Sequence, residues 1–172
     1  MLTLEEMLLR LGAAVILGAI VGFEREIVGK EAGIRTDVMV SAGAAIFTIV
    51  GLVLPYIISL SPENLPDILA RNSGFLAVIA NIVVGVGFLG AGIIVKHGLR
   101  VRGLTTAAAV WFTAAIGILC GLGLLKFAAI SSLGLVLILI LLRKLNMYKW
   151  LGKDINKNGQ ESKDIDNNGQ GE

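Results

Sequence analysis

Gly87-Phe88-Leu89-Gly90-Ala91-Gly92-Ile93-Ile94 is an apolar, glycine-rich segment, and after a short basic loop it is followed by Val101-Arg102-Gly103-Leu104-Thr105-Thr106-Ala107-Ala108. The chain therefore runs through one apolar segment, into a loop that carries lysine and arginine, and out into a second apolar segment. Lysine and arginine in short loops are retained on the cytoplasmic side of a membrane. The pattern predicts a membrane hairpin with a charged cytoplasmic tip.

The whole chain is too apolar for a soluble domain of its size. It has 172 residues, 55% of them hydrophobic, and a mean hydropathy of +0.82. A transmembrane helix needs about 20 mostly apolar residues to cross a hydrocarbon core of about 30 Å. Five such windows are present, at residues 7–23, 38–60, 74–95, 104–122 and 124–142. We therefore expect an all-α membrane protein with a bundle of five transmembrane helices.

The distribution of lysine and arginine predicts the orientation of these spans. The loops on one side carry Arg25, Lys30, Arg35, Lys96, Arg100 and Arg102, whereas those on the other carry only Arg10, Arg71 and Lys126. The positive-inside rule then places the N-terminus outside and the C-terminus on the cytoplasmic side. The net charge of +2 reflects this topology. It is too small and too dispersed for a nucleic-acid partner.

The chain also contains repeated patterns. Spans one and two resemble spans three and four, so two parallel hairpin repeats plus a fifth helix are one reading, and chance similarity between glycine-rich segments is the other. Residues 143–172 form a polar tail that we expect to be cytoplasmic and disordered. The tail twice matches the first half of a calcium-binding loop, from Asp154 and from Asp164, but lacks the glutamate that completes such a loop. Disorder is therefore favoured over calcium binding.

Small residues within the spans indicate helix contacts. Gly18 and Gly22 on the first span, and Gly117 and Gly121 on the fourth, recur every four positions and let backbones approach closely. Gly87, Gly90 and Gly92 on the third span indicate a very close crossing or a locally irregular helix. Asn81 is the strongly polar side chain in the middle of a span. Its amide is expected to bond to a neighbouring helix or to line a pathway.

Charged and hydroxyl side chains gather where the hairpins meet the cytoplasm. We call this group the charged rim: Glu24, Arg25, Glu26, Arg35, Thr36, Asp37, Arg102, Thr105 and Thr106. They are either solvated loop residues or a cluster that binds a cation, a lipid headgroup or a partner protein. Magnesium takes one or two carboxylates and retains several waters, and Glu24, Glu26 and Asp37 could supply them. No catalytic constellation is found, so we expect no enzymatic activity.

Several further motifs join the two stretches quoted first: Gly22-Phe23-Glu24-Arg25-Glu26, Ala32-Gly33-Ile34-Arg35-Thr36, Gly43-Ala44-Ala45, Trp111, and Ala114-Ala115-Ile116-Gly117. With these motifs, much of the chain resembles the MgtC/SapB family of bacterial membrane proteins. The resemblance implies an integral inner-membrane protein tied to growth in low magnesium and, in some pathogens, to survival inside host cells. Better known members carry a soluble C-terminal domain, whereas this sequence has only its polar tail, so roles of that domain are not carried over.

Two functions remain open from the sequence. The first is a non-enzymatic protein of magnesium homeostasis or stress adaptation, which acts by helix packing against itself, as a homo-oligomer, or against another membrane complex that it regulates. The alternative is a small divalent-cation or proton carrier or channel. Ionisable side chains usually mark ion routes through a bilayer, and the middle of every span lacks them. The sequence therefore favours regulation.

Overall fold

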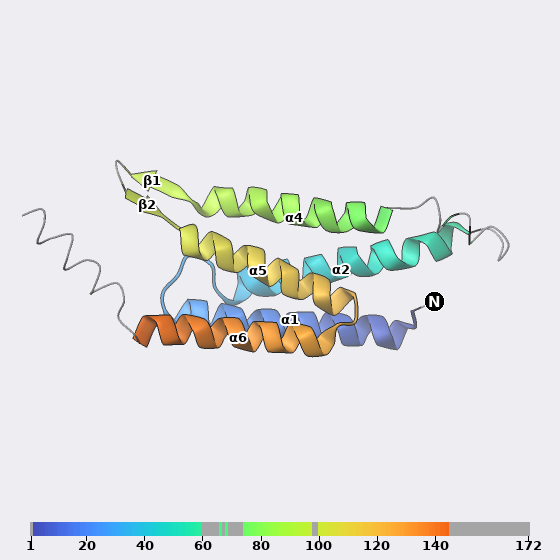
Figure 1. Ribbon diagram of the computed structural model, residues 1–172, viewed down its shortest axis with the longest axis horizontal. Helices are drawn as coiled ribbons and strands as arrows, with labels where there is room; N and C mark the ends of the chain where they lie inside the picture. Colours follow the sequence, from blue (N-terminus) through green and yellow to red (C-terminus); the bar gives the residue numbers. More distant parts are fainter. Residues whose placement is uncertain (1, 60–65, 67, 69–73, 98–99, 145–172) are drawn as a thin grey trace, which may run out of the picture. The chain divides into compact units, whose positions relative to one another are not determined.

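The computed structural model describes residues 2–59, 66, 68, 74–97 and 100–144. Its long helices are α1 (Leu4–Ile27), α2 (Ile34–Ile58), α4 (Gly74–Ile93), α5 (Leu104–Gly121) and α6 (Leu125–Lys144) (Figure 1). Strands β1 (Val95–His97) and β2 (Arg100–Arg102) form a short antiparallel ladder between α4 and α5. Within this described part, five helices are long and apolar enough to cross a membrane. The predicted five-helix membrane fold is confirmed.

Several helix ends differ from the predicted span boundaries. α1 continues to Ile27, beyond the predicted end at residue 23, and α2 begins at Ile34, before the predicted start at residue 38. A capping box at Thr3 and Glu6 starts α1 before its apolar window. Hydropathy therefore marked only the apolar part of each helix, and Glu24, Arg25 and Asp37 are helical residues. The predicted tail from residue 145 onward, with its calcium-loop patterns, lies outside the described residues.

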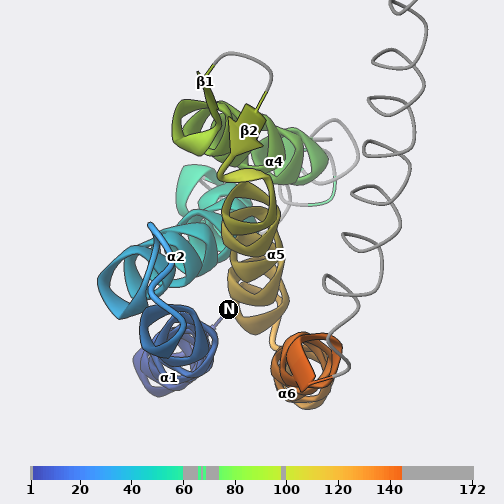
Figure 2. The ribbon, with the colours of Figure 1, turned by 90° about the vertical axis from the view of Figure 1, so that its left-hand side faces the viewer.

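The helices between residues 1 and 136 form one compact unit, and residues 137–172 form a second one. In the first unit, α5 packs against α1, α2 and α4, and Figure 2 shows it between α1 and α4 with α2 alongside. Buried side chains of α1, α2, α5 and the first turns of α6 make the main core, among them Leu17, Val21, Ile116 and Cys120. The hydroxyl of Ser132 on α6 donates to the carbonyl oxygen of Leu17 at 3.3 Å. α5 is the central helix of this unit.

Glycines make the closest crossings in the unit. A Cβ atom on Gly22 would lie 2.6 Å from the Cα of Ile34, and one on Gly121 would lie 2.6 Å from the Cβ of Thr48. Gly18 and Gly117 are equally tight, and both crossings involve Ser41. Side chains at these positions would push α2 away from α1 and α5.

The glycines of α4 behave differently. A Cβ atom on Gly90 would lie 3.5 Å from the Cβ of Ala107, which is ordinary contact. A Cβ atom on Gly85, Gly87 or Gly92 would meet nothing within 4 Å in the described chain. The very close crossing expected at Gly87, Gly90 and Gly92 is therefore not formed among the described residues. α4 nevertheless stays helical from Gly74 to Ile93, so the irregular helix is not seen either.

Candidate functional site

One end of the first unit gathers most of its ionisable side chains. The turn after α1, the start of α2, the β1–β2 ladder and the start of α5 lie together there, at the left of Figure 1. We call this region the charged end and define it by six residues: Glu24, Arg25, Glu26, Glu31, Asp37 and Thr106. It contains part of the predicted charged rim, and its members lie at very different depths.

Glu24 and Arg25 form a buried ion pair at the end of α1. Their exposed fractions are 6% and 4%. The Nε of Arg25 donates to the Oε2 of Glu24 at 2.6 Å, and its Nη2 forms an ion pair with the same oxygen. A charge taken out of water is tolerated when an opposite charge compensates it. Both side chains are therefore part of the packed interior of the helix bundle.

Glu26 closes the start of α2 from across the turn. Gly33 is the N-cap of α2 and has no side chain to accept a hydrogen bond from the first turn. The Oε2 of Glu26 accepts from the backbone N–H of Ile34 at 3.0 Å. The first amides of a helix have no partner within the helix, so an acceptor from another segment satisfies one of them. Glu26 thus joins α1 to α2.

Glu31 and Thr106 join the turn after α1 to the first turn of α5. The hydroxyl of Thr106 donates to the Oε2 of Glu31 at 2.7 Å. This hydrogen bond, with a backbone hydrogen bond and the positive charges of Lys30 and Arg102, lowers the pKa of Glu31 below its ordinary value. Thr106 itself is buried whereas Glu31 is exposed. The two hairpins are therefore joined at this end.

Asp37 is fully buried, with 0% of its surface exposed. Within the described part of the chain, neither of its carboxyl oxygens has a hydrogen-bond partner. Arg25 and Thr113 are the polar groups that lie close enough to influence it. A buried carboxylate is costly unless it is paired, so Asp37 is the least satisfied polar group of the charged end. Its position in the interior was not anticipated, because a carboxylate near the start of a helix is usually solvated.

The remaining members of the charged rim lie at the surface. Arg35, Arg102 and Thr105 are exposed, and Thr36 is half-buried. The rim is therefore divided into an interior part, which contains Glu24, Arg25, Asp37 and Thr106, and a surface part.

The predicted magnesium ligand set is not assembled. Among the described residues, no three side chains of the types His, Cys, Asp and Glu come together as metal ligands. Glu24 is engaged by Arg25, Glu26 caps Ile34, and Asp37 is enclosed by the bundle. The three carboxylates therefore do not form a metal-ligand group among the described residues.

The opposite end holds a polar contact that the sequence analysis missed. The Nη1 of Arg10 donates to the carbonyl oxygen of Gly121 at 2.8 Å, at the C-terminus of α5. A cation is favourable there because the last carbonyls of a helix carry partial negative charge. A cavity of about 430 Å³ adjoins it and is lined by Leu2, Glu6, Arg10, Leu52, Val53, Tyr56 and Leu122. In the sequence, the isolated Arg10 beside an apolar stretch was the feature that could have predicted this contact.

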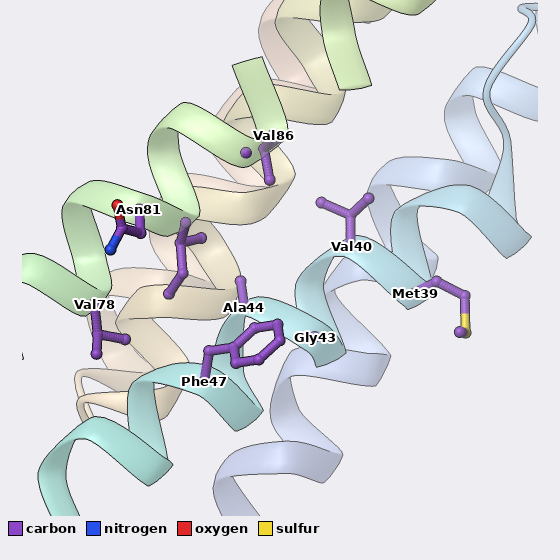
Figure 3. A pocket seen from close by; sticks show the side chains of 10 residues that line it. Met39, Val40, Gly43, Ala44, Phe47, Val78, Asn81 and Val86 are labelled. Atoms are coloured by element: carbon purple, nitrogen blue, oxygen red, sulfur yellow. The ribbon is translucent and has the colours of Figure 1, made fainter. Parts of the chain in front are cut away.

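A mostly apolar groove of about 480 Å³ lies between α2 and α4. It is lined by Met39, Val40, Gly43, Ala44, Phe47, Val78, Asn81, Ile82, Gly85 and Val86. Figure 3 shows Asn81 on α4 and Phe47 on α2, the two helices that border the groove. Asn81 is exposed, and no hydrogen bond of its amide is seen among the described residues. The bond to a neighbouring helix that we expected is thus not made in the part of the chain that the structure describes.

A family model and several known proteins match most of the chain. The family model described as the MgtC family matches residues 11–148. Protein MgtC of Brucella abortus (strain 2308) is 41% identical over 135 residues, which are 78% of this chain and 50% of the relative. Protein MgtC of Salmonella typhimurium (strain LT2) is 42% identical over 137 residues, 80% of this chain and 52% of the relative.

An uncharacterized protein of Synechocystis sp. (strain PCC 6803) is 41% identical over 144 residues, 84% of this chain and 55% of the relative. The chain thus spans about half the length of the curated relatives that it matches. No solved structure gave a significant match. The matched segment includes the charged end and the groove between α2 and α4.

Proposed function

Because the chain belongs to the MgtC family, we propose that it is a non-enzymatic protein of the bacterial inner membrane that regulates another membrane complex when magnesium is limiting. That it is a multi-pass membrane protein follows from the family and from the five apolar helices. The link to magnesium is what membership of the family implies. Regulation, and the identity of the complex, are our inference.

The placement of the ionisable groups carries this proposal. Residues 11–23, 38–58, 74–95, 103–125 and 127–142 contain no Asp, Glu, Lys, Arg or His. Routes for ions and protons are usually marked by such side chains within the membrane. At the charged end, the carboxylates of Glu24, Glu26 and Glu31 are engaged by groups of this chain. This arrangement favours a protein that binds another membrane protein over a protein that transports ions.

The surface part of the charged rim provides a contact area on the predicted cytoplasmic side. Its exposed members are Arg35, Arg102 and Thr105. Exposed cations at a membrane surface attract acidic groups of lipids and of neighbouring proteins. We therefore assign the contact with the regulated complex to these arginines and to the lipid-facing helices beside them.

Affinity capture tests this proposal. The tagged full chain is purified from membranes of cells grown with scarce and with plentiful magnesium. We expect a membrane complex to co-purify more strongly under scarcity, and Arg35→Ala combined with Arg102→Ala to weaken its capture. Lys126→Ala is the matched control, because Lys126 is also exposed but lies at the start of α6. Equal capture in both media, or equal loss with the control, contradicts regulation through this surface.

The second candidate is a small divalent-cation or proton carrier or channel. One observation favours it: the carboxyl oxygens of Asp37 are buried and have no hydrogen-bond partner among the described residues. Such a group could bind a passing cation or proton. The carrier predicts flux into liposomes that contain only this protein, with loss of flux in Asp37→Asn. Flux of that kind, without a co-purifying complex, would replace the proposal above.

A further inference from the structure

Four residues of α4 form a stripe that meets no partner helix among the described residues. Asn81, Gly85, Phe88 and Gly92 are separated by four, three and four positions, so they lie on one face of the helix. We call this face the α4 stripe. Phe88 is 84% exposed, and a Cβ atom on Gly85 or Gly92 would meet nothing within 4 Å. The packing of α4 on α5 and α2 involves residues outside the stripe, among them Val78, Ile82, Val86 and Gly90.

The α4 stripe contains a polar group at membrane depth. At a rise of 1.5 Å per residue, Asn81 lies about 10 Å from the start of α4 and about 18 Å from its end. Its side chain is exposed, and it makes no hydrogen bond among the described residues. Lipid tails offer neither donors nor acceptors at this depth, so an exposed amide there is unfavourable without a protein partner. The stripe thus requires an occupant that supplies both.

We propose that the α4 stripe binds the same stripe of a second copy of this chain. Two copies inserted in one membrane share their orientation, so a twofold axis along the membrane normal places Asn81 opposite Asn81 at equal depth. An amide is self-complementary, because its NH₂ group donates and its carbonyl oxygen accepts. The symmetric pair therefore satisfies both side chains without any other polar group.

The shape of the surface fits a second helix of the same kind. Gly85 and Gly92 leave the backbone of α4 uncovered, which lets another backbone approach closely, as at small-residue helix crossings in membranes. Asn81 and Gly85 also border the groove of about 480 Å³ beside α2, where side chains of the partner helix can be received (Figure 3). The amide of Asn81 and the two glycines thus lie on a face of α4 that adjoins the side bordering the groove. The pairing holds whether the protein regulates a complex or conducts ions.

Disulfide cross-linking in native membranes tests the interface. The full chain carries Cys120→Ala, which removes its single cysteine, together with Phe88→Cys on the α4 stripe. The control is Leu76→Cys, since Leu76 is 68% exposed on the same helix but points roughly 140° away from Asn81 at 3.6 residues per turn. Under oxidant, we expect a linked dimer with Phe88→Cys and none with Leu76→Cys. Equal yields, or no dimer with either, overturn the proposal.

Energy transfer between two labelled copies in liposomes tests the contacts themselves. Asn81→Leu is expected to weaken association by about 3- to 30-fold, the range of interhelical amide bonds in membranes, and Gly85→Leu is expected to abolish it. Gly12→Leu is the control, because a Cβ atom on Gly12 also meets nothing within 4 Å, but on α1. Unchanged association in both stripe variants contradicts the interface. Purified protein suffices, so the result is separate from the capture of a regulated complex.

Discussion

The charged end and the α4 stripe solve the same physical problem in opposite ways. At the charged end, Arg25 compensates Glu24, Glu26 caps Ile34, and Thr106 binds Glu31. On the α4 stripe, the amide of Asn81 and the backbone at Gly85 and Gly92 have no partner in the described chain. Polar groups removed from water must be satisfied somewhere. The charged end meets this requirement within one chain except at Asp37, whose carboxyl oxygens have no hydrogen-bond partner among the described residues. The α4 stripe directs its requirement to a second chain.

The largest expected effect on stability comes from breaking the buried ion pair of the charged end. Arg25→Ala leaves the carboxylate of Glu24 without its buried counter-charge and should lower the free energy of unfolding by about 3–5 kcal/mol. Arg35→Ala is the control. Arg35 is exposed, so its removal should change stability by no more than about 0.5 kcal/mol. Unfolding of the detergent-solubilised protein by a denaturing detergent measures both.

A double variant separates the charge effect from lost packing. Glu24→Gln with Arg25→Met removes both charges while keeping much of the volume, so it should recover part of the lost stability. Recovery should be incomplete, because Arg25 also lies near the buried Asp37. A double variant as unstable as Arg25→Ala would mean that packing, and not the ion pair, stabilises this end.

Alanine at matched glycines should have opposite effects in the two regions. Gly22→Ala places a Cβ atom 2.6 Å from the Cα of Ile34, and such overpacking should destabilise the fold by about 1–3 kcal/mol. Gly92→Ala meets nothing within 4 Å, and alanine favours helix over glycine by about 0.8–1 kcal/mol. In dilute detergent, Gly92→Ala should therefore stabilise the monomer. A loss of similar size at both sites would show that the α4 stripe is packed like the core.

The smallest effect is a dependence of stability on pH at the charged end. The pKa of Glu31 is lowered in the folded state, chiefly because Thr106 donates to it. The stabilisation is therefore present above the ordinary pKa of 4.5 and is lost as the pH falls through the lower folded-state value. Thr106→Val should lower the midpoint of thermal unfolding at pH 7 and reduce its fall on acidification. Thr105→Val, at the exposed neighbouring position, should leave the wild-type profile unchanged.

Hydropathy was sufficient to predict five spans but not their ends. The apolar windows end where charged residues begin, whereas α1 and α2 continue through Glu24, Arg25 and Asp37 because the fold compensates or encloses these side chains. A charged residue in a sequence normally indicates a position that is exposed to solvent. The burial of Asp37 therefore depends on the packing of α1 and α5 around α2, which no local pattern contains.

The glycine patterns showed which residues were special but not their partners. Gly22 and Gly121 lie at close crossings, whereas Gly87 and Gly92 lie open, although all four occur in similar small-residue patterns. Spacing defines a face of a helix, and only the fold determines what that face meets. The same limit applies to the predicted magnesium ligands, which are close in sequence. In the fold, Glu24 pairs with Arg25, Glu26 caps Ile34, and Asp37 is enclosed by the bundle.

The turn after α1 and the start of α5, which the β1–β2 ladder precedes, meet at the charged end. The proposed topology places these segments on one side of the membrane. Lys30→Cys and Lys96→Cys, each in the Cys120→Ala background, place single thiols at two exposed sites in these segments. A membrane-impermeant maleimide added to right-side-out and to inverted vesicles then reports the side of each thiol. We expect both thiols to be labelled only in inverted vesicles. Labelling of the two thiols from opposite sides would contradict a shared charged end.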